Sequence, residues 1–302
     1  MKTGGITLSL ALASLPGLPA SAFELVKDRQ RIQSDAITEA SGMAVSPKNG
    51  KFLWIVNDSG SKPSVHLIQT DGTKRGSVRL KDVKNKDWED LASFTLKGKS
   101  YLLVADTGDN DSKRESCTLW ILREPDLPEE GADLDTSVMP GSKIEFKYED
   151  GPRDCESVAV DEKAGKILLI SKRTKPPLVY QLPLVLDNKR GTLIARKVGS
   201  TGVKCPVVSL IPFRDQPTGL DISADGTLAA AVTYYGVFLF PKKPAESWAD
   251  AFARQPTVLA PHHLALAESV ALSKDGKSIF VISEGKNSPI VRYQDSPEAP
   301  PP

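Results

Sequence analysis

Short apolar segments, each followed by a turn glycine and a second apolar segment, recur five times along the chain. The first halves of these units read Ser41-Gly-Met-Ala-Val, Glu89-Asp-Leu-Ala, Glu156-Ser-Val-Ala-Val, Thr218-Gly-Leu-Asp-Ile and Glu268-Ser-Val-Ala-Leu, and the glycines are Gly50, Gly98, Gly165, Gly226 and Gly276. Short apolar runs bounded by turn signals are typical of buried β-strands. Strand-containing units that recur in this way indicate a propeller or a similar repeat architecture.

We interpret each unit as four strands, the fifth unit being completed from elsewhere in the chain. The first unit predicts strands over 41–46, 52–56, 64–70 and 74–80. Equivalent third strands are expected over 117–123, 178–184, 237–240 and 290–293, and fourth strands over 143–149, 192–198 and near 256–260. Two insertions interrupt the pattern: the Pro- and Glu-rich segment 124–142, and segment 245–254, which has the composition of a short helix.

The fifth unit ends after its third strand. We expect its outer strand to come from the other end of the chain, with 23–30 pairing against 290–293, because closing a ring of blades removes exposed sheet edges. The sequence therefore predicts an all-β fold, a single β-propeller of five four-stranded blades closed by the N- and C-terminal segments. Six blades remain an alternative that would need a further unit.

Polar residues occupy two fixed positions in every unit. The first position is the residue that opens the first strand, and the second ends the next apolar run, at Asp58, Asp106, Lys172, Tyr234 and Glu284. Consecutive strands of a blade alternate in direction, so both positions should lie on one face of the disc. Glu39, two residues before Ser41, should face the same side. The acidic candidates at this channel mouth are Glu39, Asp58, Glu89, Asp106, Glu156, Glu268 and Glu284; Lys172 is basic, with Arg153 and Arg173 nearby.

So many carboxylates in one partly desolvated mouth would repel one another. Several could be protonated, basic groups could interleave, or a hard cation could bind; calcium, which prefers oxygen ligands, is the cation we expect. Asp109 in the loop after Asp106 would add ligand oxygens, although this loop is not an EF-hand because Arg114 stands where that motif needs glycine. Alternatively, the carboxylates cap strand ends and pair with Arg and Lys.

Other candidate chemistry is sparse. His262 and His263 precede the first strand of the fifth unit, and His263 is a candidate general base. Lys172 and Arg173 would bind or act on an anionic group of a substrate. Tyr234 and Arg153 are further candidates for substrate binding. Ser59 lacks the sequence frame of a hydrolase nucleophile, and the chain has no HExxH motif, phosphate-binding glycine loop or dinucleotide fingerprint.

Several short motifs resemble those of a known group. They are the strand-opening Glu-x-x-Ala pattern (Glu89, Glu156, Glu268), Val56-Asn-Asp58, Asp106-Thr-Gly-Asp-Asn110 and Ser283-Glu284-Gly285. Over about residues 37–293, the chain resembles exported bacterial β-propellers that include the phytase-like esterase and SdiA-regulated families, and more distantly the calcium-dependent gluconolactonase and paraoxonase propellers. The resemblance implies calcium at the channel mouth and hydrolysis of a phosphate ester, ester or lactone. Thr218, Lys172 and Tyr234 depart from the acidic pattern.

Composition and the chain ends complete the picture. The first 22 residues have a charged start at Lys2, a short apolar run and a small-residue cleavage site, as in a secretory signal peptide. We therefore expect a periplasmic or secreted protein. The propeller is expected over 23–296 and a Pro-rich disordered tail over 297–302. The apolar run is short for a membrane anchor. The formal charge of +1 over 302 residues gives no basic stripe for nucleic acid.

Three cysteines leave at least one thiol unpaired. Cys155 and Cys205 both precede expected first strands and are a possible disulfide pair in an exported protein, and buried thiols are the alternative.

These observations favour a monomeric calcium-dependent hydrolase or small-ligand binder that acts on an anionic molecule. The competing class is a non-enzymatic protein that binds an envelope component.

Overall fold

The computed structural model describes residues 23–187, 191–204 and 213–295. This part of the chain contains 22 strands and one short helix, so the predicted all-β class is confirmed. The expected signal peptide (1–22), the expected tail (297–302) and Cys205 lie outside the described residues. No helix within the described ranges has the length and apolarity that a membrane span requires.

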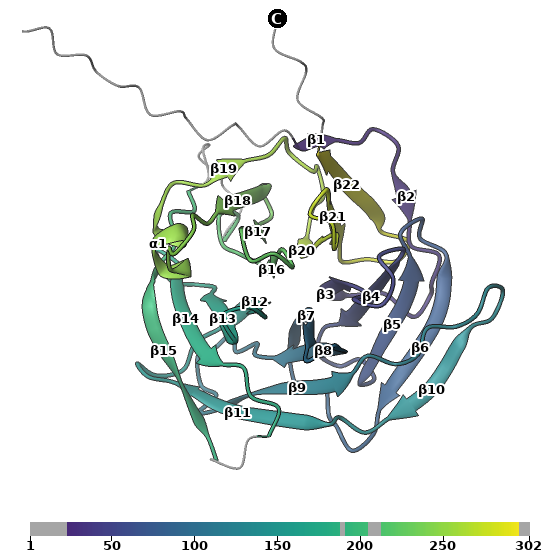
Figure 1. Cartoon of the computed structure of the whole chain (residues 1–302), viewed down its shortest axis with the longest axis horizontal. Helices are drawn as coiled ribbons and strands as arrows, with labels where there is room; N and C mark the ends of the chain where they lie inside the picture. The colour runs from purple at the N-terminus through teal and green to yellow at the C-terminus, as the bar shows by residue number, and fades with distance from the viewer. Residues whose placement is uncertain (1–22, 188–190, 205–212, 296–302) are drawn as a thin grey trace, which may run out of the picture.

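Five inner strands lie nearest the centre of the molecule (Figure 1). They are β3 (Ala40–Val45), β7 (Trp88–Leu96), β12 (Cys155–Asp161), β16 (Gly219–Ile222) and β20 (Ala267–Leu272). Each packs against the next, and β20 packs against β3, so the five form a closed cycle. Gly42 permits the close approach of β3 to β7, because a Cβ atom there would lie 2.4 Å from the backbone nitrogen of Leu91.

Each inner strand forms an antiparallel hairpin with the strand that follows it. These second strands are β4 (Phe52–Asn57), β8 (Lys99–Asp106), β13 (Lys166–Ser171), β17 (Leu228–Val232) and β21 (Ser278–Ser283). Third strands follow outward: β5 (Ser64–Gln69), β9 (Cys117–Arg123), β14 (Leu178–Pro183), β18 (Val237–Pro241) and β22 (Pro289–Asp295). The strands lie where the sequence pattern places them.

The outer strands join these hairpins into four sheets rather than five. Four of them are β6 (Lys74–Leu80), β11 (Ser142–Tyr148), β15 (Leu193–Ser200) and β19 (Thr257–Val258). β11 pairs with β9 on one side and, in parallel, with β15 on the other, which merges the second and third predicted units into one eight-stranded sheet. Its end strands β7 and β12 pack against each other, so this sheet nearly closes on itself.

The expectation for segment 124–142 was incomplete, because this insertion contains a strand. β10 (Leu134–Val138) pairs in parallel with β6 and extends the first sheet to five strands. Its five residues are half-buried or exposed without regular alternation, so the sequence carried no strand pattern there. The expected short helix is present as α1 (Trp248–Ala253), which begins at the N-cap Ser247.

The two ends of the described chain meet, as predicted. β1 (Phe23–Leu25) pairs antiparallel with β22 through Phe23 and Asp295, and β2 (Gln30–Arg31) pairs with the start of the same strand. The N-terminal segment therefore covers the edge that β22 would otherwise expose.

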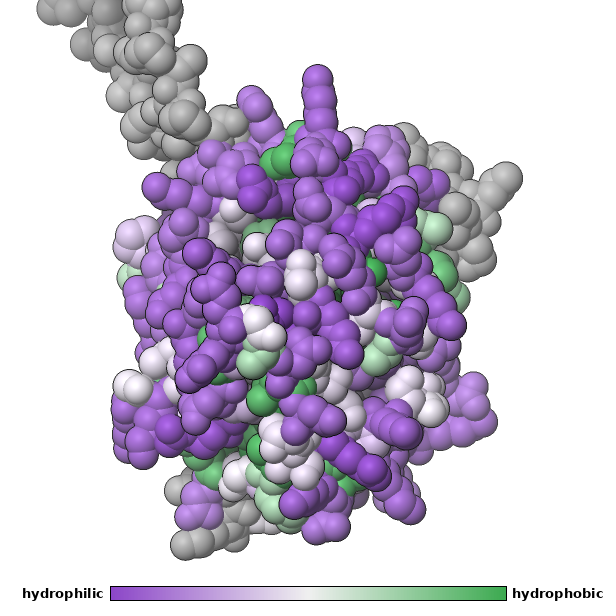
Figure 2. Space-filling model, turned by 90° about the vertical axis from the view of Figure 1, so that its right-hand side faces the viewer, coloured by the Kyte–Doolittle hydropathy of each residue, from purple (hydrophilic) through white to green (hydrophobic). Residues whose placement is uncertain are grey.

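Apolar side chains fill the space between neighbouring sheets. All residues of β3, β4, β12 and β20 are buried, whereas the outer surface seen in Figure 2 is mostly hydrophilic with small scattered apolar patches. Cys117 and Cys155 lie in one of these cores as thiols, without a disulfide among the described residues.

Candidate functional site

β-Bulges place the first polar position of four units at the start of the inner strands. The ladder register shifts between Ala40 and Gly42, Trp88 and Asp90, Cys155 and Ser157, and Ala267 and Ser269. Ser41, Glu89, Glu156 and Glu268 are therefore the extra residues of four bulges. A bulge changes the direction of a side chain from that set by regular pleating. Three of the four bulge residues are glutamates: Glu89, Glu156 and Glu268.

Two groups of carboxylates meet beside these bulges. Oxygens of Asp58, Asp87 and Glu89 lie within 4.8 Å of one another, and so do oxygens of Glu89, Asp154 and Glu156. Glu89 belongs to both groups. We call the five residues, with the neighbouring Glu268, the acidic centre.

The loop after β8 fits closely against the acidic centre. Thr107 and Gly108 donate their backbone N–H groups to the carbonyl of Asp87 at 3.1 Å. A Cβ atom on Gly108 would lie 2.3 Å from Oε1 of Glu89 and 2.5 Å from Oδ2 of Asp87. The absence of a side chain at Gly108 therefore lets these two carboxylates come together.

Two basic side chains compensate one side of the acidic centre. Lys172 forms a short ion pair with Glu156, and its Nζ lies 3.4 Å from the hydroxyl of Tyr234. Tyr234 donates in turn to Oε1 of Glu268 at 2.6 Å. Arg173 donates from Nε to Oδ2 of Asp154 at 2.6 Å.

Burial is the main cause of raised pKa values in the acidic centre. Burial, reinforced by Glu156 and Asp58, raises the pKa of Glu89 well above its usual value. Burial raises the pKa of Asp87 to about 6, that of Glu156 to about 7 against the opposing effect of Lys172, and that of Glu268 to about 9. The centre is therefore arranged to take up protons or a cation.

Glu89 is the least compensated member. Its exposed fraction is 6%, yet among the described residues no donor forms a hydrogen bond to its carboxylate, and every neighbouring charge that strongly affects its pKa is acidic. A buried carboxylate without a partner is costly, so a ligand that supplies positive charge would relieve this position.

Two predicted acidic residues serve other partners. Asp106 forms a 2.8 Å ion pair with Arg114. Asp106 lies within the β8 ladder opposite Trp88, whereas Asp58 and Lys172 each follow the last residue of their ladders. Because an offset of one residue turns a side chain to the other face of a sheet, Asp106 does not share the direction of Asp58 and Lys172. Asp109 accepts backbone N–H groups of Lys113 and Arg114, both at 2.8 Å, and so closes its own loop.

The remaining acidic candidates lie at the margin. Glu39 is exposed and contributes its backbone carbonyl, which accepts from the N–H of Asp58 at 2.8 Å. Glu284 is half-buried and close enough to raise the pKa of Glu268.

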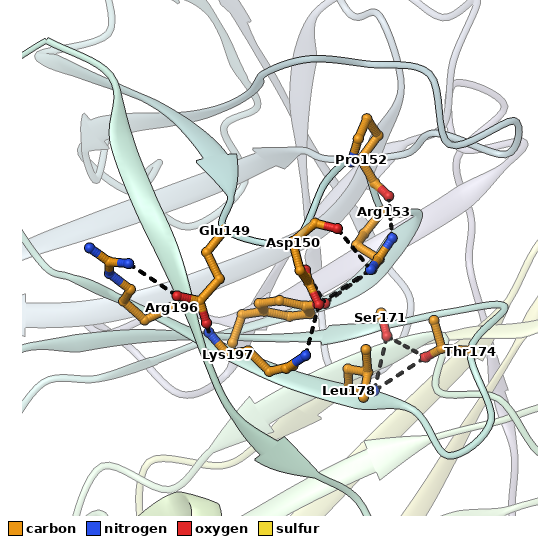
Figure 3. A network of polar contacts seen from close by, with 10 residues as sticks. Glu149, Asp150, Pro152, Arg153, Ser171, Thr174, Leu178, Arg196 and Lys197 are labelled. Atoms are coloured by element: carbon orange, nitrogen blue, oxygen red, sulfur yellow. Dashed lines mark hydrogen bonds and ion pairs between the residues drawn. The ribbon is translucent and has the colours of Figure 1, made fainter.

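Arg153 and His263 are not brought into the acidic centre. Figure 3 shows Arg153 in an outer network with Asp150, where its Nε donates to the hydroxyl of Tyr180 at 3.1 Å and its Nη2 lies 3.3 Å from Asp150. His263 is exposed, with a positive φ of 58°. Its neighbour His262 is buried, with Nε2 3.0 Å from the carbonyl of Thr233, and burial lowers its pKa to about 4. No contact in the described structure supports His263 as a base.

Sequence reasoning missed Asp87 and Asp154. Each stands two residues before the strand-opening glutamate, at the position for which only Glu39 of the first unit was considered. The same period-two rule applied to every unit would have identified both.

Comparison with known proteins gives no assignment. No protein-family model matches the chain, and no curated protein matches it.

Proposed function

We propose that the chain is a five-bladed β-propeller that binds a divalent cation, calcium first among the candidates, at the acidic centre. The closed cycle of inner strands and the pairing of the chain ends support this architecture, with the β11–β15 pairing as a bridge between two blades. The cation site would lie at the end of the inner strands where Glu89 and Glu156 form bulges.

The unpartnered carboxylate of Glu89 carries the proposal. Calcium accepts six to eight oxygen ligands in flexible geometry, and Glu89 stands where two groups of carboxylates meet. Asp58 and Asp87 of one group, and Asp154 and Glu156 of the other, are the candidates for the remaining side-chain oxygens. Asp109 and Asp106, which the sequence also suggested, belong to neither group; they pair with Arg114 and with backbone N–H groups of their own loop.

We further propose that the site performs calcium-dependent hydrolysis of a phosphate ester, ester or lactone in the periplasm or outside the cell, in line with the resemblance of the motifs. A bound divalent ion would polarise an ester or phosphoryl oxygen. Arg173, whose side chain is 30% exposed beside the buried Asp154, is placed to bind an anionic group of the substrate.

Calcium titration of the full mature chain tests the cation site. We expect heat of binding by calorimetry and a melting temperature that rises with calcium and falls back with chelator, because a ligand that binds only the native state stabilises it. The variant Asp111→Asn should respond to calcium as the wild type does, since Asp111 is an exposed carboxylate outside the acidic centre that pairs with Lys113. The absence of both signals at millimolar calcium would refute the proposal.

Hydrolysis is tested separately with aryl phosphates, aryl esters and lactones in the presence of calcium. We expect turnover of one class that chelator abolishes. A chain that binds calcium but hydrolyses none of them would favour the alternative, a non-enzymatic protein that binds an envelope component.

A further inference from the structure

The two groups of carboxylates in the acidic centre differ in how their charge is compensated. We call Asp58, Asp87 and Glu89 the open half, and Glu89, Asp154 and Glu156 the closed half. In the closed half, Lys172 pairs with Glu156 and Arg173 pairs with Asp154. Only Glu89 belongs to both halves. The negative charge is therefore compensated by basic residues on the Asp154 and Glu156 side of Glu89 and not on the Asp58 and Asp87 side.

Lys172 is held inside the protein. Its side chain is 5% exposed, its ammonium contacts Glu156 and the hydroxyl of Tyr234, and it lies 5.2 Å from the centroid of the Tyr234 ring. An ammonium group has three donors and no acceptor, and these contacts direct it toward Glu156 and Tyr234. Lys172 is therefore poorly placed to reach a substrate, in contrast to the more exposed Arg173.

The open half has no comparable partner among the described residues. The Asp87 carboxylate, like that of Glu89, accepts no hydrogen bond there, and the Asp58 carboxylate contacts the N–H of its neighbour Ser59. The positive charge of Arg114 lowers the pKa of Asp87, but its guanidinium is bound to Asp106 at 2.8 Å and to the carbonyl of Gly108 at 2.7 Å.

We propose that Lys172 is a tethered cation that fills the closed half, so that the acidic centre binds one divalent cation and binds it in the open half. This inference rests on the proposed cation site and specifies how the chain limits it. A second divalent ion in the closed half would meet the ammonium charge at short range and would have to displace it from Glu156. Because like charges repel strongly at a buried site, Lys172 controls both the number of ions and the position of the one that binds.

Lys172→Met tests the proposal, because methionine keeps the unbranched apolar stem and removes the charge. We expect calorimetry to show one calcium per wild-type chain, and either a second site in Lys172→Met or an affinity at least about tenfold tighter, as expected from removing a competing charge. Lys113→Met, which removes an exposed lysine paired with Asp111, is the matched control and should bind as the wild type does. An unchanged stoichiometry and affinity in Lys172→Met would overturn the proposal.

A second comparison keeps the test decisive if Lys172→Met does not fold. Asp87→Asn removes a carboxylate of the open half and should weaken calcium binding by about 30-fold or more, whereas Asp154→Asn should weaken it by less than about fivefold, as its charge is already paired. Equal losses, or two calcium ions in the wild-type chain, would overturn the tethered-cation proposal while leaving the proposed cation site intact. A wild-type chain that binds no calcium would overturn the cation site itself.

Discussion

Glu89 and Asp90 are neighbours on β7, and both are buried carboxylates with raised pKa values, yet their surroundings are opposite. Asp90 accepts from the backbone N–H of Leu91 at 2.8 Å, from that of Val158 at 2.7 Å and from that of Leu220 at 3.2 Å. It therefore links three inner strands, β7, β12 and β16. Glu89 has no donor among the described residues.

The comparison shows that burial and a raised pKa do not by themselves identify a functional carboxylate. Asp221 repeats the pattern of Asp90: it accepts from the N–H groups of Ile222 and Leu272, both at 2.8 Å, and burial raises its pKa to about 7. Carboxylates whose oxygens are saturated by backbone donors stabilise the cycle of inner strands. A buried carboxylate without donors is the candidate for binding.

The largest expected effect of this difference is on stability. Asp90→Ala leaves three buried N–H groups without an acceptor, and each unsatisfied donor costs about 1–3 kcal/mol, so we expect the free energy of unfolding to fall by about 3 kcal/mol or more. Urea denaturation measures this loss. The calcium response of the folded fraction should persist, and a variant as stable as the wild type would show that the bonds of Asp90 contribute little.

The converse substitution, Glu89→Gln, should affect binding instead. We expect calcium affinity to fall by about 100-fold, because a neutral amide replaces the carboxylate shared by both halves, with little loss of stability without calcium. Removing one of several repelling charges would even raise the melting temperature slightly. Calorimetry and thermal melting without calcium measure the two effects. Destabilisation as large as that of Asp90→Ala would show that Glu89 has a structural role.

Much of the fold follows from the sequence because strand patterning is local. The apolar runs and turn glycines predicted the inner and second strands, and the missing last strand predicted the pairing of β1 and β2 with β22. The parallel pairing of β11 with β15 was not predictable in this way, since it joins segments of different units at the outer edge. Nothing in their local periodicity specifies which outer strand each will meet.

The acidic centre was only partly predictable. Glu89, Glu156, Lys172 and Tyr234 were expected on one face because consecutive strands of a blade alternate in direction, but the bulges that aim Glu89 and Glu156 were not predicted. Asp106 was misplaced because the β7–β8 hairpin is paired one residue further along than its counterparts, a register that the glycine spacing does not report. The donor count that separates Glu89 from Asp90 depends on contacts between strands and therefore required the structure.

The pH dependence of stability offers a third test. The pKa values of Asp87, Glu156 and Glu268 rise to about 6, 7 and 9 in the folded state, whereas carboxyl groups of an unfolded chain titrate near 4. The folded state then holds more protons between these limits, so without calcium the free energy of unfolding should fall as the pH rises from about 4 to about 9. Denaturation at several pH values measures this slope.

Calcium should counteract that slope, because it binds the deprotonated carboxylates and competes with protons. The stabilisation produced by calcium should therefore grow with pH. Asp221, which titrates within the same window but is saturated by backbone donors, should contribute a part of the slope that calcium does not remove. A calcium effect that is constant between pH 5 and pH 9, in contrast to this expectation from linkage, would contradict the assignment of Asp87 and Glu89 as ligands.

The smallest expected effect concerns the residue that lets the open half assemble. In Gly108→Ala the new Cβ atom would lie 2.3 Å from Oε1 of Glu89 and 2.5 Å from Oδ2 of Asp87. Flexible side-chain ends can move away at low cost, so we expect stability to change by less than about 1 kcal/mol. The displaced carboxylates should bind calcium about tenfold more weakly, since the ligand oxygens no longer converge. Gly50→Ala is the matched control, because a Cβ atom there meets nothing within 4 Å. Calorimetry measures the calcium affinity of both variants. Equal affinities would show that calcium binding does not need the close approach of Glu89 and Asp87. The contrast between Glu89, which has no donor, and Asp90, which has three, would then need an explanation without a cation in the open half.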